Sequence, residues 1–186
     1  TPYLFYVKDC SENVIDGVHV SQIYAQEMSE DLLELKGEPV LVAQPDQPWE
    51  GIDKDWRWNE GPFVLKVDGV YYLMYSANVF SSAEYAVGYA TAAAPLGPWT
   101  KAKENPILAK RLEIGVSGPG HNSVTLSPDG TEMFIVYHTH TDPKAPSGNR
   151  TVNIDRLYVQ GGRMWVEGPT RSPQPAPSAR RRGVDG

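Results

Sequence analysis

Cysteine is nearly absent from this sequence, since Cys10 is the only one among 186 residues. A single thiol cannot form an internal disulfide, so a disulfide framework is excluded and the redox compartment is left open. Long apolar runs are also missing, and because no stretch of 18 apolar residues occurs we expect no membrane span and no membrane partner. No signal peptide is visible, and the sequence begins at Thr1 rather than at a methionine, which leaves the natural N-terminus open.

Positive charge is in short supply. Lys and Arg number 17 against 23 Asp and Glu, which gives a formal net charge of −6. An acidic chain is a poor match for a phosphate backbone, so nucleic acid is not expected as a partner. The one basic cluster, Arg180 to Arg182, lies in a Pro-rich tail and is interpreted as a solvated end. The hydrophobic content of 40% is typical of a globular domain with a real core.

Helical periodicity is the third absence. The nearest candidate, AQEMSEDLLELKG at residues 25–37, could equally be a loop between strands with one helical turn. Short segments rich in β-branched and aromatic residues fill the sequence instead, among them PFVLKV, VYYLMYSA, EYAVGYAT and EMFIVYHTH. Asp-Gly or Gly-Gly pairs at 68–69, 129–130 and 161–162 are typical of turns between strands. The sequence therefore predicts an all-β fold.

An internal repeat organises these segments. YLFYV at 3–7, YLMYS at 72–76 and FIVYH at 134–138 are three versions of one strand, each followed by a second strand and a shorter third element. A unit of roughly 60–70 residues with three or four antiparallel strands is typical of a β-propeller blade, and closed propellers have about four to eight blades. We predict that residues 1–170 form an incomplete β-propeller of about three blades and that residues 171–186 form a closing segment or tail.

The repeat also predicts where two polar residues meet. The Asp-Gly turns at 68–69 and 129–130 are 61 positions apart, and the same shift carries Glu60 to His121. We expect both residues at the start of the innermost strand of their blades, close to the central axis. By this alignment the first repeat begins with its second strand at Tyr3, so its own inner strand would precede Thr1.

Four blocks carry a resemblance to a known family: WNEGPFVLKVDGVYYLMYSAN, YAVGYATAAAPLGPWTK, GPGHNSVTLSPDGTEMFIVYHTH and NRTVNIDRLYV. In this order and spacing the chain resembles the family 43 glycoside hydrolases over nearly all of residues 3–178. The resemblance implies a five-bladed propeller, of which this chain is the C-terminal portion. It also implies removal of arabinofuranose or xylose units from hemicellulose or pectin, and it favours a secreted or periplasmic location.

That family uses three carboxylates, and the resemblance implies that Glu60 is the general acid. The general base and an Asp that tunes the pKa of the acid would lie upstream of Thr1, so we expect no turnover unless N-terminal blades or a second chain supply them. Asp16, in VIDGVH, resembles the tuning motif but lies in a loop, and we reject it. Inversion needs two carboxyl groups about 6.5–9.5 Å apart, with a water between the base and the sugar. Without the resemblance, an ordinary glutamate at a strand edge is the simpler interpretation of Glu60.

The resemblance also implies a metal ion and an active-site arginine. Members of the family often carry Ca²⁺ or a similar ion in the central channel near the residue that matches His121. Calcium prefers oxygen ligands, so a contact through water is favoured, and a hydrogen-bonded core histidine without an ion is the alternative. Arg150 resembles a family arginine that reaches into the site. Arg156 is a competing match, which we expect to form an ion pair with Asp155 or a neighbour.

Several aromatic residues and histidines are further candidates. Trp58 and Phe80, together with Trp56, could stack on the apolar face of a sugar ring, with packing as the alternative for each. His138 and His140 alternate on one strand. No third ligand is spaced for a metal, so we expect these two to pack or hydrogen-bond between blades.

The predicted function is that of a glycosidase acting on arabinofuranosyl or xylosyl linkages by an inverting general acid/base mechanism. The rival hypothesis is a non-catalytic, sugar-binding or structural propeller fragment. A related propeller fructosidase is a weaker rival, because the Gly-Pro-Gly-His-Asn block fits it poorly.

Overall fold

The computed structural model describes residues 1–179, and the prediction of an all-β fold is confirmed. Residues 29–34 form a turn between two strands, and the two helical elements in the described range are short 3-10 turns elsewhere. No helix in this range is long and apolar enough to cross a membrane. The elements in chain order are β1 (Tyr3–Lys8), β2 (Val14–Ile15), β3 (Val18–Val20), β4 (Gln22–Met28), β5 (Leu35–Ala43), η1 (Pro48–Glu50), β6 (Trp56–Arg57), β7 (Asn59–Val67), β8 (Val70–Ala77), β9 (Ala86–Ala92), β10 (Thr100–Lys101), η2 (Leu112–Ile114), β11 (Gly120–Leu126), β12 (Met133–His140), β13 (Arg150–Gln160) and β14 (Arg163–Glu167).

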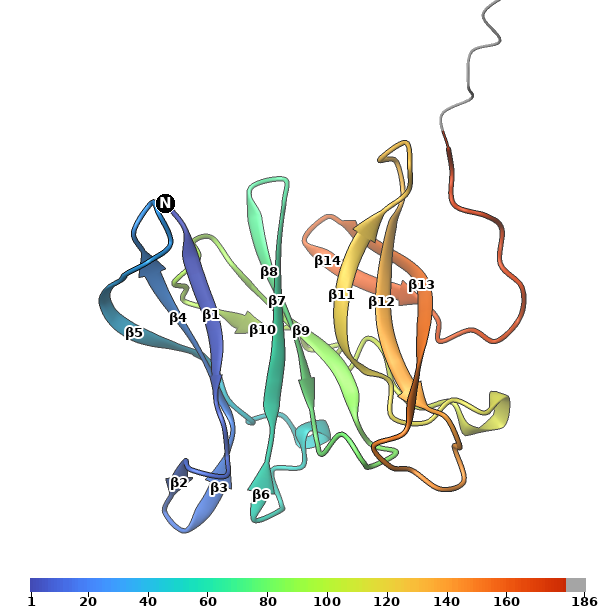
Figure 1. The fold of residues 1–186 in the computed structure, drawn as a ribbon, viewed down its shortest axis with the longest axis horizontal. Coiled ribbons are helices and arrows are strands. Elements are labelled where there is room, and N and C mark those ends of the chain that lie inside the picture. Colours follow the sequence, from blue (N-terminus) through green and yellow to red (C-terminus); the bar gives the residue numbers. More distant parts are fainter. Residues whose placement is uncertain (180–186) are drawn as a thin grey trace, which may run out of the picture.

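Three antiparallel sheets lie side by side along the molecule (Figure 1). Their strand orders are β1-β4-β5, β10-β9-β8-β7 and β11-β12-β13-β14, and we call them blades 1, 2 and 3. Each blade covers one repeat of the sequence, in agreement with the predicted number. A fourth small sheet, β2-β3-β6, contains a parallel strand pair that the repeat did not predict.

Blade 1 lacks the innermost strand that the other two blades have. β8 lies between β7 and β9, and β12 lies between β11 and β13. Their counterpart β1 pairs with β4, and no strand within residues 1–179 is hydrogen-bonded to its other edge. The backbone groups along that edge are therefore available for pairing.

Facing blades are joined by two apolar cores. The core between blades 2 and 3 includes Met74 and Ile135, and the core between blades 1 and 2 includes Ile23 and Tyr75. These four side chains are 0% exposed. Full burial of a side chain such as Ile or Met contributes about 1.5–3 kcal/mol, so the blades are held together by close packing at both junctions.

The pairing of the inner strands contradicts the predicted match between Glu60 and His121. Glu60 of β7 lies opposite Ser76 of β8. The counterpart of Ser76 in blade 3 is His138, and the residue opposite His138 is Gly120. Gly120 therefore occupies the position of Glu60, and His121 lies one position further along.

Backbone geometry gives the same assignment and the reason for the error. His121 corresponds to Gly61, and both have left-handed backbone, with φ of 51° and 59°. The connection between β11 and β12 spans residues 127–132, whereas residues 68–69 alone connect β7 and β8. The Asp-Gly pair of blade 3 is therefore further from the start of its inner strand than the pair of blade 2. An alignment that superimposes the two pairs is shifted by one residue at Glu60.

The segment after residue 170 runs beside blade 3 as an irregular chain (Figure 1). Arg156 donates from Nη2 to the carbonyl of Pro175 at 3.2 Å, and Ser178 donates its backbone N–H to Glu132 at 2.6 Å. The domain boundary at residue 170 stays a prediction. The basic cluster at 180–182 lies outside the described residues.

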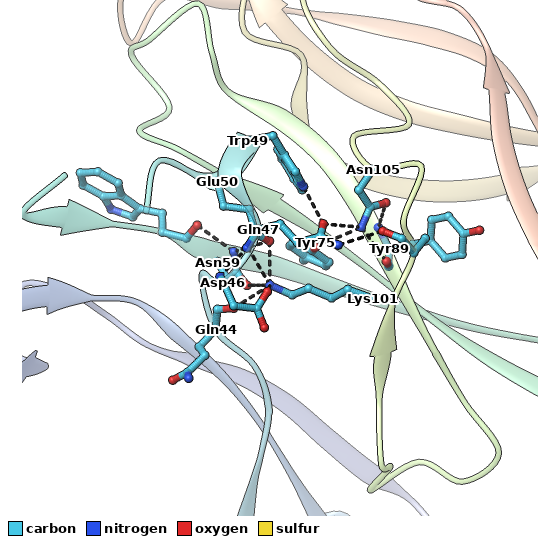
Figure 2. A network of polar contacts seen from close by, with 12 residues as sticks. Gln44, Asp46, Gln47, Trp49, Glu50, Asn59, Tyr75, Tyr89, Lys101 and Asn105 are labelled. Atoms are coloured by element: carbon cyan, nitrogen blue, oxygen red, sulfur yellow. Dashed lines mark hydrogen bonds and ion pairs between the residues drawn. The ribbon is translucent and has the colours of Figure 1, made fainter. Parts of the chain in front are cut away.

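A buried ion pair joins blade 2 to the loop that follows blade 1 (Figure 2). Lys101 of β10 contacts both carboxylate oxygens of Glu50, at 2.7 and 2.9 Å, and Glu50 is completely buried. The same ammonium group contacts Asp46 at 2.9 Å. Glu50 also accepts hydrogen bonds of 2.7 Å from the backbone N–H groups of Asp46 and Gln47. Hydrogen-bond donors therefore compensate the buried negative charge at both carboxylate oxygens of Glu50.

Asn59 connects this network to the inner strand of blade 2 (Figure 2). Its side chain accepts from Lys101 at 3.0 Å and donates to Oε1 of Glu50 at 3.2 Å. Asn59 is fully buried and is the first residue of β7, directly before Glu60. The ion pair thus fixes the point at which β7 begins.

We expect Lys101→Met to lower the free energy of unfolding by about 3–5 kcal/mol, because it leaves the carboxylate of Glu50 buried without its counter-charge. Urea denaturation of the purified chain measures the change. Lys103→Met makes the same substitution at an exposed position of the same segment, and it should stay within about 0.5 kcal/mol of wild type. Equal stability of the two variants would contradict the role given to the ion pair.

Candidate active site

Glu60 lies at a bulge near the start of β7. The pairing of β7 with β8 is interrupted after Glu60 and resumes at Phe63, and a bulge of this kind redirects the strand end. The carboxylate is partly buried, and Oε1 accepts a hydrogen bond of 2.6 Å from the hydroxyl of Tyr85. Because Oε1 is engaged by Tyr85, Oε2 is the oxygen left to exchange a proton.

Tyr85 is held rigidly beside this carboxylate. Its side chain is 0% exposed. Gly120 passes so close that a Cβ atom there would lie 2.1 Å from the Tyr85 ring, so a larger residue would displace the ring. Burial, reinforced by the negative charge of Glu60, raises the pKa of Tyr85 above its usual range, and the hydroxyl remains a donor.

His138 and Arg150 form a second layer behind Tyr85. The His138 ring stacks on Tyr85 with centroids 5.6 Å apart and planes 6° apart. Arg150 donates from Nη1 to Nε2 of His138 at 2.9 Å, and its guanidinium lies 5.0 Å from the centre of the Phe80 ring. Arginine can only donate, so Nε2 of His138 is unprotonated and Nδ1 carries the proton. Burial, together with the charges of Arg150 and His121, lowers the pKa of His138 to about 4, and the ring is neutral at pH 7.

Arg150, and not Arg156, belongs to this cluster. Arg156 forms an ion pair with Glu132, with Nε and Oε1 2.9 Å apart. Asp155, the first partner proposed for Arg156, instead accepts a hydrogen bond from the hydroxyl of Tyr137 at 2.5 Å. The expectation of an ion pair with a neighbour was correct, and the choice of Asp155 was wrong.

Tyr85 was not singled out from the sequence, although the repeat contains a signal for it. In blade 3, Arg150 lies opposite His140. In blade 2, continuing the pairing of Ala77 with Ala86 by one position places Tyr85 opposite Asn78. Tyr85 and Arg150 therefore occupy matching positions of successive blades, and both point into the same site.

His121 lies next to Glu60 in space although the two are not equivalent in the repeat. A Cβ atom on Gly61 would lie 3.3 Å from the His121 ring, so the ring packs over the residue after Glu60. The backbone N–H of His121 donates to Oγ of Ser76 at 2.8 Å, and its ring centre lies 6.4 Å from that of His138. The side chain is exposed to solvent.

The donor groups of this site do not suit direct coordination of calcium. Calcium takes about six to eight oxygen ligands, and within residues 1–179 no group of three or more His, Cys, Asp and Glu side chains is placed to hold a metal ion. His138 presents an N–H at Nδ1 while Arg150 occupies Nε2, so its ring is not a ligand. These residues fit at most a contact through water at His121.

The aromatic candidates come from two different places in the fold, the segment before Glu60 and the chain after β8. Trp58, partly buried, precedes it by two residues and stacks on Trp56 with ring centres 6.3 Å apart. Phe80, which is 42% exposed, lies under the guanidinium of Arg150. Asp16, which the sequence analysis rejected as the pKa-tuning residue, is in the exposed turn between β2 and β3.

His140 is a structural residue, as predicted. It is 0% exposed, and its ring nitrogens lie 2.9 Å from Oγ of Ser117 and 2.9 Å from the carbonyl oxygen of Phe80. Phe80 follows the second strand of blade 2, so this contact joins blades 2 and 3. A Cβ atom on Gly118 would lie 2.3 Å from the His140 ring, which leaves no room for a larger residue.

Comparison with known proteins gives a consistent result. The model of a family described as "Glycosyl hydrolases family 43" matches residues 2–163. A β-D-galactofuranosidase of Aspergillus niger is 36% identical over 71% of this chain and 35% of its own length. An extracellular exo-α-(1→5)-L-arabinofuranosidase of Streptomyces avermitilis is 36% identical over 67% of this chain and 27% of its own length. The chain thus spans about a quarter to a third of the curated relatives it matches.

A solved structure matches nearly the whole chain. It is a thermostable family-43 glycoside hydrolase that is 66% identical to this chain, with a TM-score of 0.95. The match covers 96% of this chain and 57% of that one. Together with the three sheets described above, it confirms the prediction of an incomplete β-propeller.

We expect His138 to stay uncharged until the pH approaches about 4, because its burial beside Arg150 disfavours the imidazolium. The native pKa lies below the ordinary value of 6.5, so the unfolded chain takes up the proton first. Stability from the neutral ring is therefore complete above pH 6.5 and declines as the pH falls to about 4. An NMR titration of the His138 ring protons should give a midpoint near 4, and a midpoint near 6.5 would contradict the buried arrangement.

Proposed function

Because the chain belongs to family 43 of the glycosyl hydrolases, we propose that it is the part of a glycosidase that carries the general acid, Glu60. The observation that carries the proposal is the fixed carboxylate at the start of the inner strand of blade 2. Tyr85 donates to Oε1 at 2.6 Å, His138 stacks on Tyr85, and Arg150 donates to His138. A proton on Oε2 would be delivered to the oxygen of the leaving group.

The remaining steps follow from inversion. As the acid protonates the leaving oxygen, a carboxylate on the opposite face of the sugar activates a water for attack at the anomeric carbon. Arg150 is proposed to hydrogen-bond sugar hydroxyls with those N–H groups that do not contact His138. Trp58 and Phe80 are proposed to bound the sugar with apolar surface.

We propose that the general base and the pKa-tuning Asp come from strands outside residues 1–186. The open edge of β1, where blades 2 and 3 each have an inner strand, supports this proposal. N-terminal blades of the same protein, or a second chain, would supply these strands. The name of the extracellular relative supports a secreted protein, which recovery of the protein from culture medium would test.

The proposed substrate is an arabinofuranosyl or xylosyl linkage in a plant polysaccharide. The names of both curated relatives describe enzymes that act on furanosides, which favours the arabinofuranosyl alternative. A non-catalytic sugar-binding propeller remains the second candidate. This candidate requires the aromatic residues but no proton on Glu60, so an assay of hydrolysis distinguishes it from the glycosidase.

In the protein completed by the missing strands, Glu60→Gln should lower hydrolysis of aryl α-L-arabinofuranosides or aryl β-D-xylosides by about 10²- to 10⁴-fold, since the amide cannot act as the acid. The assay uses gel-filtered protein whose intact mass has been measured, so that any co-eluting polypeptide is identified. Glu84→Gln is the matched control, because this carboxylate is 53% exposed and pairs with Lys110.

Two results would contradict this account. Full activity of Glu60→Gln would remove the proposed acid. Hydrolysis by the 20.6 kDa chain alone would contradict the proposed origin of the base. Sugar binding without hydrolysis, when the missing strands are supplied, would favour the binding module.

We also propose that a calcium ion, where the complete propeller holds one, contacts His121 through water. Such an ion would supply positive charge near the central axis. Ca²⁺ should then raise the melting temperature of the complete protein, and His121→Ala should reduce that increase. His19→Ala serves as the control at a histidine of another sheet. An equal increase for wild type and His121→Ala would reject the contact.

A further inference from the structure

The small sheet β2-β3-β6 places a hairpin beside the strand that leads to Glu60. His19 pairs with Trp56 and Val20 pairs with Arg57 in parallel register. Hydrogen bonds extend the pairing in both directions, from the N–H of His19 to Asp55 at 2.8 Å and from the N–H of Asn59 to the carbonyl of Ser21 at 3.3 Å. The hairpin therefore follows this strand up to the residue before Glu60.

This pairing builds an aromatic stack. The His19 ring lies flat on Trp56, with centroids 3.7 Å apart and planes 3° apart, and Trp56 in turn stacks on Trp58. Nδ1 of His19 lies 2.8 Å from the carbonyl oxygen of Cys10, which fixes the ring. Trp56 is nevertheless 44% exposed. A large aromatic surface is thus held rigid and left in contact with water.

The stack lies close to Glu60 along the same stretch of chain. Trp56 precedes Glu60 by four residues, which in an extended strand is at most about 13 Å. Burial is the main cause that raises the pKa of the Cys10 thiol, and the charges of Asp9 and Glu60 add to it. The residue that fixes His19 is therefore within electrostatic reach of the carboxylate.

We propose that His19, Trp56 and Trp58 form a platform that binds a neutral sugar unit of the substrate next to the unit that reacts at Glu60. This inference rests on the proposed function, because it takes Glu60 as the acid that marks where the substrate reacts. A rigid indole binds the apolar face of a sugar ring at little cost in conformational entropy. The platform would give the enzyme a preference for oligosaccharides over aryl glycosides of a single sugar, which have no second sugar unit to bind.

The test is a titration of the 186-residue chain with α-1,5-linked arabinotetraose, followed by the indole N–H resonances of its tryptophans. We expect the Trp56 resonance to shift and the Trp165 resonance to stay. Trp56→Ala should weaken binding about three- to tenfold, within the range of aromatic contact energies. The matched control is Trp165→Ala, since Trp165 is 42% exposed and stacks on Tyr158 in blade 3, away from Glu60.

The outcomes separate this inference from the proposed function. Unchanged binding by Trp56→Ala, or no shift of the wild-type Trp56 resonance, overturns the platform even if Glu60 proves to be the acid. A Trp56 shift in the wild-type chain, together with weaker binding by Trp56→Ala, supports the platform even if no aryl glycoside is hydrolysed. The wild-type resonances report on binding without a variant, so a Trp56→Ala chain that does not fold leaves the test intact.

Discussion

The start of β7 depends on a charge that is buried in the protein and fully compensated there. Glu50 is removed from water completely, and removing a carboxylate from water costs several kcal/mol unless donors replace the lost hydration. Lys101 and two backbone N–H groups provide these donors, and they come from β10 and from the loop before η1. Any shift of one blade against that loop would separate the charges. Because Asn59 belongs to the same network, the rigidity extends to the backbone of Glu60.

The candidate site is built where blades meet, so it depends on their packing. Glu60 and Tyr85 belong to blade 2, whereas His138 and Arg150 come from blade 3, and the stacking of His138 on Tyr85 crosses the junction. The apolar core around Met74 and Ile135 closes the same junction. The packing of the two blades therefore determines how accurately the carboxylate of Glu60 is placed, and the stability of this junction and the geometry of the site are linked.

Much of the fold follows from the sequence because it repeats. The segments YLFYV, YLMYS and FIVYH lie within β1, β8 and β12, and their aromatic and β-branched residues are a local strand signal that each repeat carries by itself. Two kinds of feature could not be predicted in this way. The network of Lys101 and Glu50 joins residues 51 positions apart and occurs once, so no period marks it. The parallel pairing of His19 with Trp56 connects two-residue and three-residue strands, which are too short to show alternation.

The misplaced match between Glu60 and His121 shows why the site was harder to predict than the fold. Strands keep a fixed rise per residue, but loops change length freely, so an alignment anchored on a turn carries the difference in loop length into the strand. The bulge is the better anchor, since Gly61 and His121 share a left-handed backbone that few residues adopt. At this bulge blade 2 presents a carboxylate just before the left-handed residue. In blade 3 the residue before the left-handed position is Gly120, where the Tyr85 ring leaves no room for a side chain. The left-handed residue of blade 3, His121, itself carries an imidazole. One backbone feature thus presents two different side chains, and the requirement that Tyr85 fit between the blades excludes a carboxylate at the matching position of blade 3.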